Sequence, residues 1–545
     1  MVAALAIVGA ASAHATLVSS TPANDEVLRR APAQVVLRFN EPVETAFGSV
    51  RVYDGAARRV DDGHTTRPQP QEVAVGLRQG LPKGTYTVAW RVISADSHPV
   101  SGAFVFHVGK PGAGAAGIAS QVLGEQAGSA TIDRTFDVVR FLNFAFILLC
   151  AGGAGALALV FVNEASAIRR PLWAALAITG VLLAVASVAA IGLEGAKASG
   201  LGLGSAFRAS LFRDVLETQF GKVSLARAGL ALAVTCLATF ALWRPGRTER
   251  SLAFLAGAVG AAIAITPASS GHARVEGTFA VVVDWVHVLG ASAWAGGLAF
   301  LLLALWRAQG DRWPLATRVV PRFSLLAVVS VTALLLAGVV SGYLEVRSWN
   351  GLWDTTYGRL LLVKVALLLP VLALGAFNNR VSVPRLRAGI ASTLERRRFL
   401  RSTATELALV VAIVGVTAVL VAEPPAKAQV AAQAGPVSQD TTVGPFDLNL
   451  VVDPARTGRN QIHLYLLEQS TGQPANVDEI QLSASLPAAG VGPLRLEAVP
   501  AGPGHAIVTG ATFPLVGDWR LRLDVRRGDF DQWTTTLTVP IRKDT

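Results

Sequence analysis

The chain has 545 residues, of which 52% are hydrophobic and only 16% are charged, and its mean hydropathy is +0.47. Soluble globular proteins carry about 25% charged residues, so this composition excludes a soluble enzyme, a disordered chain and a collagen-like protein. It indicates a multidomain membrane protein with soluble parts attached. The net charge of +11 does not imply a nucleic-acid partner, because cytoplasmic loops of membrane proteins collect Lys and Arg.

Cysteine and methionine are scarce. The two cysteines, Cys150 and Cys236, both lie within apolar runs, which predicts neither a disulfide framework nor a thiolate metal site. Met1 is the only methionine. The chain therefore cannot build a cage of thioether sulfurs, the soft ligands that select Cu(I).

Residues 1–13 form a short apolar leader that ends in the small residues Ala11-Ser12-Ala13. This ending is typical of a signal-peptide cleavage site. The leader lacks a basic start, which indicates either a degenerate leader or a translation start further upstream. Cleavage after Ala13 would make His14 the first residue of the mature protein.

Residues 14–110 alternate between apolar and polar side chains, as in Val35-Leu37-Phe39 and Tyr86-Val88-Trp90-Val92. Turn residues such as Asp54-Gly55 and Asp62-Gly63 separate the alternating runs. Period-two runs with such turns predict an all-β sandwich. A linker rich in Gly and Ala follows at 111–130.

Residues 131–422 contain eight apolar stretches, and a membrane-spanning helix needs about 20 apolar residues. The stretches at 251–267 and 403–422 are the weakest of the eight. We expect helices at 136–163, 171–195, 222–243, 251–267, 279–306, 324–345, 358–377 and 403–422.

The loop charges predict the orientation of these helices. The loops after the first, third, fifth and seventh helices carry 16 Lys and Arg residues, and the alternate loops carry 6. The positive-inside rule places the richer set in the cytoplasm. Both chain ends then face outward from the cytoplasmic membrane of a bacterium, in agreement with the leader. In one outer loop, Phe207, Leu211, Phe212 and Val215 have helical spacing, which predicts a segment along the outer membrane surface.

A polar linker at 423–442 leads into residues 443–545. Phe446, Leu448, Leu450 and Val452 alternate with polar neighbours, and the run from Trp519 to Val525 repeats the pattern. We predict a second outward-facing β-sandwich.

The most informative candidate site combines His14 with Asp96 and His98. An N-terminal histidine offers its free α-amine and its imidazole Nδ1, which chelate one metal ion together. Asp96 and His98 lie two residues apart on an extended segment and point the same way. Three nitrogens and one carboxylate oxygen suit tetragonal Cu(II) better than Ca²⁺ or Mg²⁺. A solvated loop is the alternative interpretation of Asp96-Ser97-His98.

The sequence around these residues resembles the CopC family of copper-binding proteins. The resemblance rests on His14-Ala15-Thr16-Leu17-Val18-Ser19-Ser20-Thr21-Pro22, Arg38-Phe39-Asn40-Glu41-Pro42-Val43, and the run from Tyr86 to Gly102. It implies a sandwich of immunoglobulin or cupredoxin type that binds Cu(II) through His14, Asp96 and His98. It also implies that Glu41 lies near the metal. The Met-rich Cu(I) site of some members is missing.

The membrane region holds a second candidate site. His272 lies at the outer end of the fourth predicted helix, and Asp284 and His287 lie within the fifth. Asp284 and His287 are three residues apart and therefore share one helix face. Ionisable groups in a membrane span are costly unless they face a partner or a water-filled cavity. A hydrogen bond from His287 to a carbonyl, which would only pack two helices, is the alternative.

The same region resembles CopD, the membrane partner of CopC. The resemblance rests on Gly271-His272-Ala273, Asp284-Trp285-Val286-His287, Ala293-Trp294-Ala295-Gly296-Gly297-Leu298, Thr356-Tyr357-Gly358 and Asn378-Asn379. It implies an eight-helix membrane protein that handles copper, in which His272, Asp284 and His287 are the candidate residues for a membrane copper site. CopC fused to CopD and followed by a β domain resembles the YcnJ-type copper uptake proteins of Gram-positive bacteria.

The remaining polar residues are interpreted as structural. His107 alternates away from its apolar neighbours, which predicts a surface position on a strand. Glu406 is expected to open the last helix, where it would cap the helix or interact with its dipole. His463 and His505 are isolated in the sequence. Snorkelling at the outer helix ends accounts for Glu194, Glu345 and Lys364.

The residues together favour a protein, not an enzyme, that captures Cu(II) outside the cell and passes copper to or through the cytoplasmic membrane. Its expected partners are copper, the lipid bilayer, and an external reductase or a copper-accepting protein. Copper uptake and copper resistance both stay open. So do a redox enzyme with copper or haem in the bundle, and a scaffold that delivers copper to a partner cuproenzyme.

Overall fold

A computed structural model describes most of the chain, and its strands and helices follow the predicted order. The described residues are 15, 17–22, 26–39, 41–45, 50–94, 99–109, 130–199, 201–246, 248–308, 312–433, 437–471, 473–502, 504–528 and 531–543. The described residues divide into two compact units; the first ends at Lys427 and the second begins at Ala428. The prediction of two β domains separated in sequence by an eight-helix bundle is confirmed.

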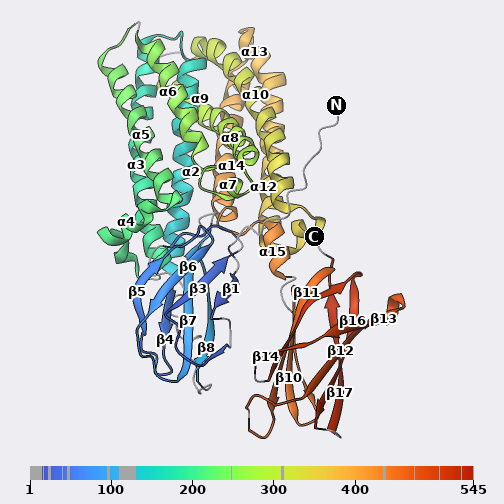
Figure 1. Cartoon of the computed structure of the whole chain (residues 1–545). Coiled ribbons are helices and arrows are strands. Elements are labelled where there is room, and N and C mark those ends of the chain that lie inside the picture. The colour runs from blue at the N-terminus through green and yellow to red at the C-terminus, as the bar shows by residue number, and fades with distance from the viewer. Residues whose placement is uncertain are drawn as a thin grey trace, which may run out of the picture. The chain divides into compact units, whose positions relative to one another are not determined.

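The first β domain consists of two four-stranded sheets that enclose an apolar core (Figure 1). One sheet has the order β1-β3-β6-β5 and the other has the order β2-β8-β7-β4. Val35, Leu37 and Phe39 point into the core, as their alternation predicts. The strands are β1 Leu17–Thr21, β2 Val27–Leu28, β3 Gln34–Phe39, β4 Val50–Tyr53, β5 Asp61–Thr66, β6 Glu72–Leu77, β7 Gly84–Ile93 and β8 Pro99–Val108.

The described residues contain eight helical segments that are long and apolar enough to cross a membrane, so the chain is a multi-pass membrane protein. They run alongside one another in Figure 1. The two weakest predicted spans, at 251–267 and 403–422, are present as α6 Thr248–Ile265 and α14 Thr393–Leu420. The spans are α2 Ala130–Leu159, α3 Ser166–Ser199, α5 Gln219–Trp243, α6 Thr248–Ile265, α8–α9 Thr278–Arg307, α10 Trp313–Val346, α12–α13 Thr356–Arg387 and α14 Thr393–Leu420.

Two of the spans are interrupted by a π-helical turn. The fifth consists of α8 Thr278–Ala291, a π turn at Ser292–Gly296 and α9 Gly297–Arg307. The seventh consists of α12 Thr356–Phe377, a π turn at Asn378–Ser382 and α13 Val383–Arg387. Such turns occur often at functional sites in helices.

Short helices join the spans on the predicted outer side. They include the 3₁₀ turn η1 Leu203–Phe207, α4 Ala209–Glu217, α7 His272–Val275 and α11 Trp349–Asp354, and a further short helix, α15 Ala426–Gln433, follows the last span. The predicted helix near Phe212 is therefore present as α4. Its Val215 is buried, and the Cβ that an alanine would place at Gly195 of α3 would lie 3.3 Å from Val215. One face of α4 therefore packs on α3.

The second β domain also consists of two sheets around one core, in the orders β14-β15-β11-β10-β9 and β13-β12-β16-β17. Phe446, Leu448, Leu450 and Trp519 are buried in that core. The strands are β9 Val437–Val443, β10 Phe446–Asp453, β11 Gly458–Glu468, β12 Glu479–Leu486, β13 Val491–Glu497, β14 Val499–Gly502, β15 His505–Phe513, β16 Gly517–Arg527 and β17 Asp531–Ile541, with a 3₁₀ turn η4 at Pro487–Ala489.

Candidate functional site

The three predicted Cu(II) ligands His14, Asp96 and His98, and the leader before them, lie outside the described residues. The residues that flank them are described. Ala15 is buried in the core of the first β domain. Strand β7 ends at Ile93, which pairs with Pro99 at the start of β8. The three ligands therefore remain predictions, although Asp96 and His98 lie between two strands that the structure describes.

These flanking residues lie at one end of the sandwich. Leu17 pairs with Phe39 in antiparallel strands, so the start of β1 lies beside the end of β3. Glu41 comes two residues after β3, and its side chain is buried, with 7% of its surface exposed. A backbone bridge pairs Glu44 with Ile93. The start of β1, Glu41 and the end of β7 thus share this end of the sandwich, which we call the β7–β8 end.

His107 differs from its prediction as a surface residue. It is buried, and its Nδ1 lies 2.9 Å from Oγ1 of Thr85. The sequence could not predict this burial, because the short strand β2 adds to the sheet beside β8, where Val27 pairs with His107.

Glu44 connects the β7–β8 end to the helices. Its carboxylate accepts a hydrogen bond of 3.0 Å from the backbone N–H of Gln219, the first residue of α5. Burial raises the pKa of Glu44, and the hydrogen bond from Gln219 and the nearby charge of Arg274 in α7 oppose that shift. The side-chain amide of Gln219 then donates to the carbonyl of Ser269 over 3.3 Å. This route leads to the loop before His272.

His272 and Asp284 belong to one group of charged residues near the predicted outer helix ends. Asp284 in α8 interacts electrostatically with His272 in α7, with Glu345 in α10 and with Lys364 in α12. Glu345 and Lys364 thus have charged neighbours in the protein, which the prediction of snorkelling did not include.

Lys427 extends this group through two carboxylates. Its ammonium forms ion pairs with Glu276, between α7 and α8, and with Glu345 at 3.6 Å. It also donates to the carbonyl of Leu344 over 2.9 Å. We call His272, Glu276, Asp284, Glu345, Lys364 and Lys427 the outer charged cluster.

His287 lies one helical turn further along α8 than Asp284. Its Nδ1 is 3.1 Å from the carbonyl oxygen of Leu334 in α10. Gly338 makes room for the ring, because a Cβ at that position would lie 3.2 Å from Cε1 of His287. The structure thus contains the helix-packing hydrogen bond that was one of the two interpretations. It engages one ring nitrogen, and Nε2 is the nitrogen that could still bind a metal.

Within the described ranges, no three His, Cys, Asp or Glu side chains are arranged to hold a metal ion. His272 and Asp284 are brought into one cluster, whereas His287 has its own partner in α10. The assignment of these three residues to a membrane copper site remains a prediction.

The π turn after α8 packs closely against α2. A Cβ at Gly296 would lie 2.0 Å from the carbonyl oxygen of Leu148, and a Cβ at Gly152 would lie 1.8 Å from that of Ser292. The two backbones therefore touch where only glycine fits. This contact holds the helix that carries Asp284 and His287.

A polar network near the predicted cytoplasmic ends was missed at the sequence level. Nδ2 of Asn378 donates to Oε1 of Glu406 over 2.5 Å, and the hydroxyl of Ser402 donates to Oδ1 of Asn378 over 2.9 Å. Glu406 is buried in the middle of α14, so the prediction that it opens this helix is wrong. The helix begins earlier, at Thr393, behind a capping box formed by Ser392 and Glu395. In the sequence, the polar pair Asn378-Asn379 beside an apolar run was the feature that could have indicated this network.

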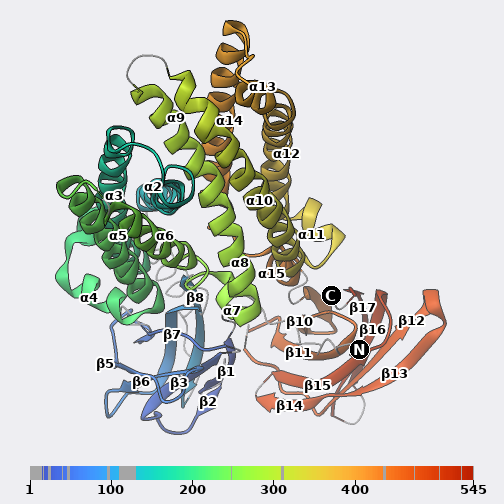
Figure 2. The ribbon, with the colours of Figure 1, turned by 90° about the horizontal axis from the view of Figure 1, so that it is seen from above.

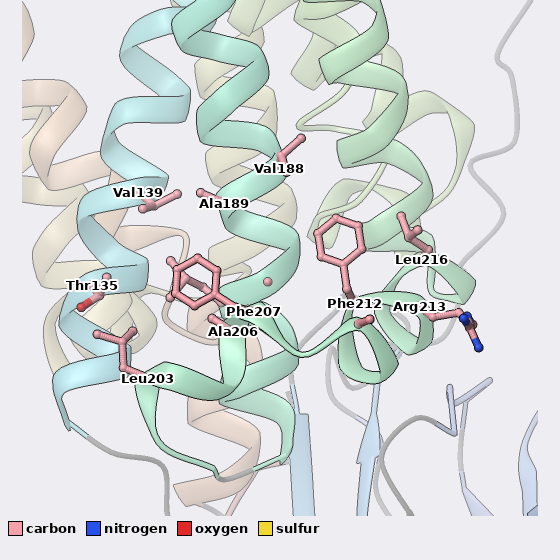
Figure 3. Close-up of a pocket in the computed structure, with 13 residues that line it drawn as sticks. Thr135, Val139, Val188, Ala189, Leu203, Ala206, Phe207, Phe212, Arg213 and Leu216 are labelled. Carbon is pink, nitrogen blue, oxygen red and sulfur yellow. The ribbon is translucent and has the colours of Figure 1, made fainter.

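A cavity of about 740 Å³ lies between α2, α3, η1 and α4 (Figure 3). Among the described residues that line it, Thr135 and Arg213 have polar side chains, and Arg213 points away from the cavity. These described lining residues include no His, Cys, Asp or Glu and therefore offer no side chain suited to bind copper.

Three family models match the chain: "CopC domain" over residues 17–109, "Copper resistance protein D-like, N-terminal domain" over 131–281, and "Copper resistance protein D" over 317–420. The chain is 29% identical over 494 residues to Copper transport protein CutJ of Bacillus subtilis (strain 168), and the match covers 86% of this chain and 85% of that protein.

It is 30% identical over 267 residues to the inner membrane protein YebZ of Escherichia coli (strain K12), covering 46% of this chain and 86% of that protein. Among solved structures, CopC from Methylosinus trichosporium OB3b matches with 32% identity and a TM-score of 0.16, covering 18% of this chain and 95% of that chain.

Proposed function

Because the chain belongs to the CopC–CopD family of copper transport and resistance proteins, we propose that it captures Cu(II) outside the cell and passes copper inward along its helix bundle. His14, Asp96 and His98 of the first β domain are the capturing ligands, with Glu41 beside them. His272, Asp284 and His287 receive the metal. The chain is a carrier of copper and not an enzyme.

The observation that carries this proposal is the route from Glu44 through Gln219 to Ser269. The route begins at the β7–β8 end, where β7 ends before Asp96 and β8 begins after His98. It ends at Ser269, three residues before His272. A metal ion released at that end therefore meets the outer charged cluster first. The cluster offers a cation the three carboxylates of Glu276, Asp284 and Glu345, for which the metal ion competes with the ammonium groups of Lys364 and Lys427.

Depth along α8 orders the receiving residues. The helix begins at Thr278, and at 1.5 Å per residue Asp284 lies about 9 Å and His287 about 14 Å along it. His272 precedes the helix. We infer that copper passes His272, Asp284 and His287 in that order. Imidazole and carboxylate suit Cu(II), and an external reductase would supply the reduced ion if the bundle carries Cu(I).

The capture site is tested by its N-terminal amine. One residue added before His14 leaves all side chains in place but removes the free amine and its chelate ring. We expect this extension to weaken Cu(II) binding about as much as His98→Ala, because the second nitrogen of a chelate binds at high effective concentration. The measurement is a competition titration of the full chain against a Cu(II) chelator.

The matched control is His64→Ala, because His64 is an exposed histidine of the same domain, and this variant should bind as tightly as the parent. Equal affinities for the authentic and extended N-termini would overturn the N-terminal site, and with it cleavage after Ala13. Affinity should also fall below about pH 6.5, because the metal competes with protons for the imidazoles.

A further inference from the structure

Two histidines that lie 42 residues apart in sequence meet on the second β domain. Strands β11 and β15 are neighbours in its five-stranded sheet (Figure 2), and Tyr465 pairs with His505. Ile462 and Leu464 point into the core, so the intervening His463 points to the opposite face. His463, Tyr465 and His505 therefore share the outward face of the sheet.

The two imidazoles face each other through their nitrogens. Nδ1 of His463 lies 3.1 Å from Nε2 of His505. The ring planes differ by 13° with centroids 5.4 Å apart, and the ring of Tyr465 stacks on His505 at 4.4 Å. The stacked ring of Tyr465 and the half-buried positions of both histidines keep the pair together.

The separation of these two nitrogens matches that of two adjacent ligands of one metal ion. In the structure the nitrogens point directly at each other in an N–H···N contact, so both rings must turn, and the proton between them must leave, before they bind one metal ion. Metal–nitrogen bonds to histidine are about 2.0–2.1 Å, which places neighbouring ligand nitrogens about 2.9–3.4 Å apart in tetragonal or tetrahedral sites. Burial lowers the pKa of His463, and the charge of Asp453 opposes that shift. The neutral imidazole is the form that binds metals.

We propose that His463 and His505 form a second copper site, on the C-terminal β domain. Cu(II) is the divalent first-row ion that nitrogen ligands hold most tightly. Two protein ligands leave positions for water or for a donor from another molecule, which suits a site that exchanges its metal. The inference that the metal is copper rests on the proposed function. The inference that His463 and His505 bind a metal rests only on their positions in the structure.

The test uses the full chain with His98→Ala, which removes the N-terminal site. Cu(II) is added, and bound copper is measured by equilibrium dialysis and electron paramagnetic resonance, with and without His463→Gln or His505→Gln. Glutamine keeps a hydrogen-bonding side chain of similar length, so the sheet should fold. We expect each change to remove one equivalent of bound copper and the matching signal with nitrogen hyperfine splitting.

The matched control, His64→Gln, should leave bound copper unchanged. Equal copper in the His463→Gln protein and its parent would overturn the site, and so would retention of Zn²⁺ in place of Cu(II) when both are offered. Failure of the N-terminal site gives a different result, because His98→Ala would then not change the copper bound by the otherwise unaltered chain.

Discussion

At the scale of single residues, the ring of His287 is held between a carbonyl and a glycine of α10. Its Nδ1 contacts the carbonyl oxygen of Leu334, and Gly338 leaves just enough space beside Cε1. The ring orientation determines where Nε2 points. Small changes in α10 should therefore alter copper transfer without removing any ligand.

We predict that Gly338→Ala reduces copper transfer several-fold while the protein still folds, because the added Cβ displaces the His287 ring by a few tenths of an ångström. The matched control is Gly342→Ala, one turn along α10, where an added Cβ meets nothing within 4 Å. Copper uptake into proteoliposomes measures both. If the two variants transfer copper equally, the position of His287 does not govern transfer.

Asp61 gives the first β domain a pH-dependent contact. It is 1% exposed and accepts hydrogen bonds from Arg59 and from the backbone N–H of Val52. Burial opposes ionisation, but these hydrogen bonds are stronger in sum and lower the pKa of Asp61. A lowered folded-state pKa stabilises the domain above the unfolded value of about 4, and this contribution is lost as pH falls through the folded-state pKa.

We predict that Asp61→Asn costs about 1–3 kcal/mol near neutral pH, because a buried hydrogen-bonded carboxylate is lost. The variant should also lose less stability than the parent between pH 5 and 3. Hydrogen-exchange protection of residues 50–66 in the full chain, corrected for intrinsic rates, measures both effects. Parallel pH profiles for the two proteins would show that Asp61 does not supply the acid sensitivity.

The sequence could predict individual residues only where local pattern decides their environment. The alternation of Val35, Leu37 and Phe39 placed them correctly in the core. The environments of other residues depend on distant parts of the chain and could not be predicted. Strand β2 covers His107, and Asn378 contacts Glu406. Strand β15 brings His505 beside His463.

At the scale of elements, the close contact between α2 and the π turn at Ser292–Gly296 determines how α8 sits in the bundle. We predict that Gly296→Ala destabilises the protein by about 1–3 kcal/mol or more, because its Cβ would overlap the carbonyl of Leu148. Gly155→Ala in α2, where an added Cβ meets nothing within 4 Å, is the control. Thermal unfolding in detergent should separate the two, and equal midpoints would contradict the contact.

All eight spans could be predicted because a run of about 20 apolar residues is a strong local signal. Their ends were less accurate. Helix α14 begins at Thr393, ten residues before the predicted start, because its first three turns carry charged residues such as Glu395 and Arg396. The π turns were not predicted, since nothing local in Ala293-Trp294-Ala295 separates a π turn from an α-helix.

At the scale of the whole molecule, the proposed path for copper depends on the join between the first β domain and the helices. Two hydrogen bonds contribute to it: Glu44 accepts from the backbone of Gln219, and Arg91 donates to the carbonyl of Lys197 over 2.9 Å. These partners lie at the start of α5 and near the end of α3. The sequence predicted both domains but could not predict this join, because its residues are far apart along the chain.

Copper accumulation by cells shows whether the protein imports copper through the site that contains His98. Cells that lack their own copy receive the full chain, His98→Ala, Glu44→Ala or the control His64→Ala under limiting copper, and cell-associated copper is measured. We predict that the parent and His64→Ala raise cell copper, that His98→Ala does not, and that Glu44→Ala binds Cu(II) normally but delivers less. If the parent chain lowers cell copper, or if the His98→Ala variant accumulates as much as the parent, the protein does not import copper through this site.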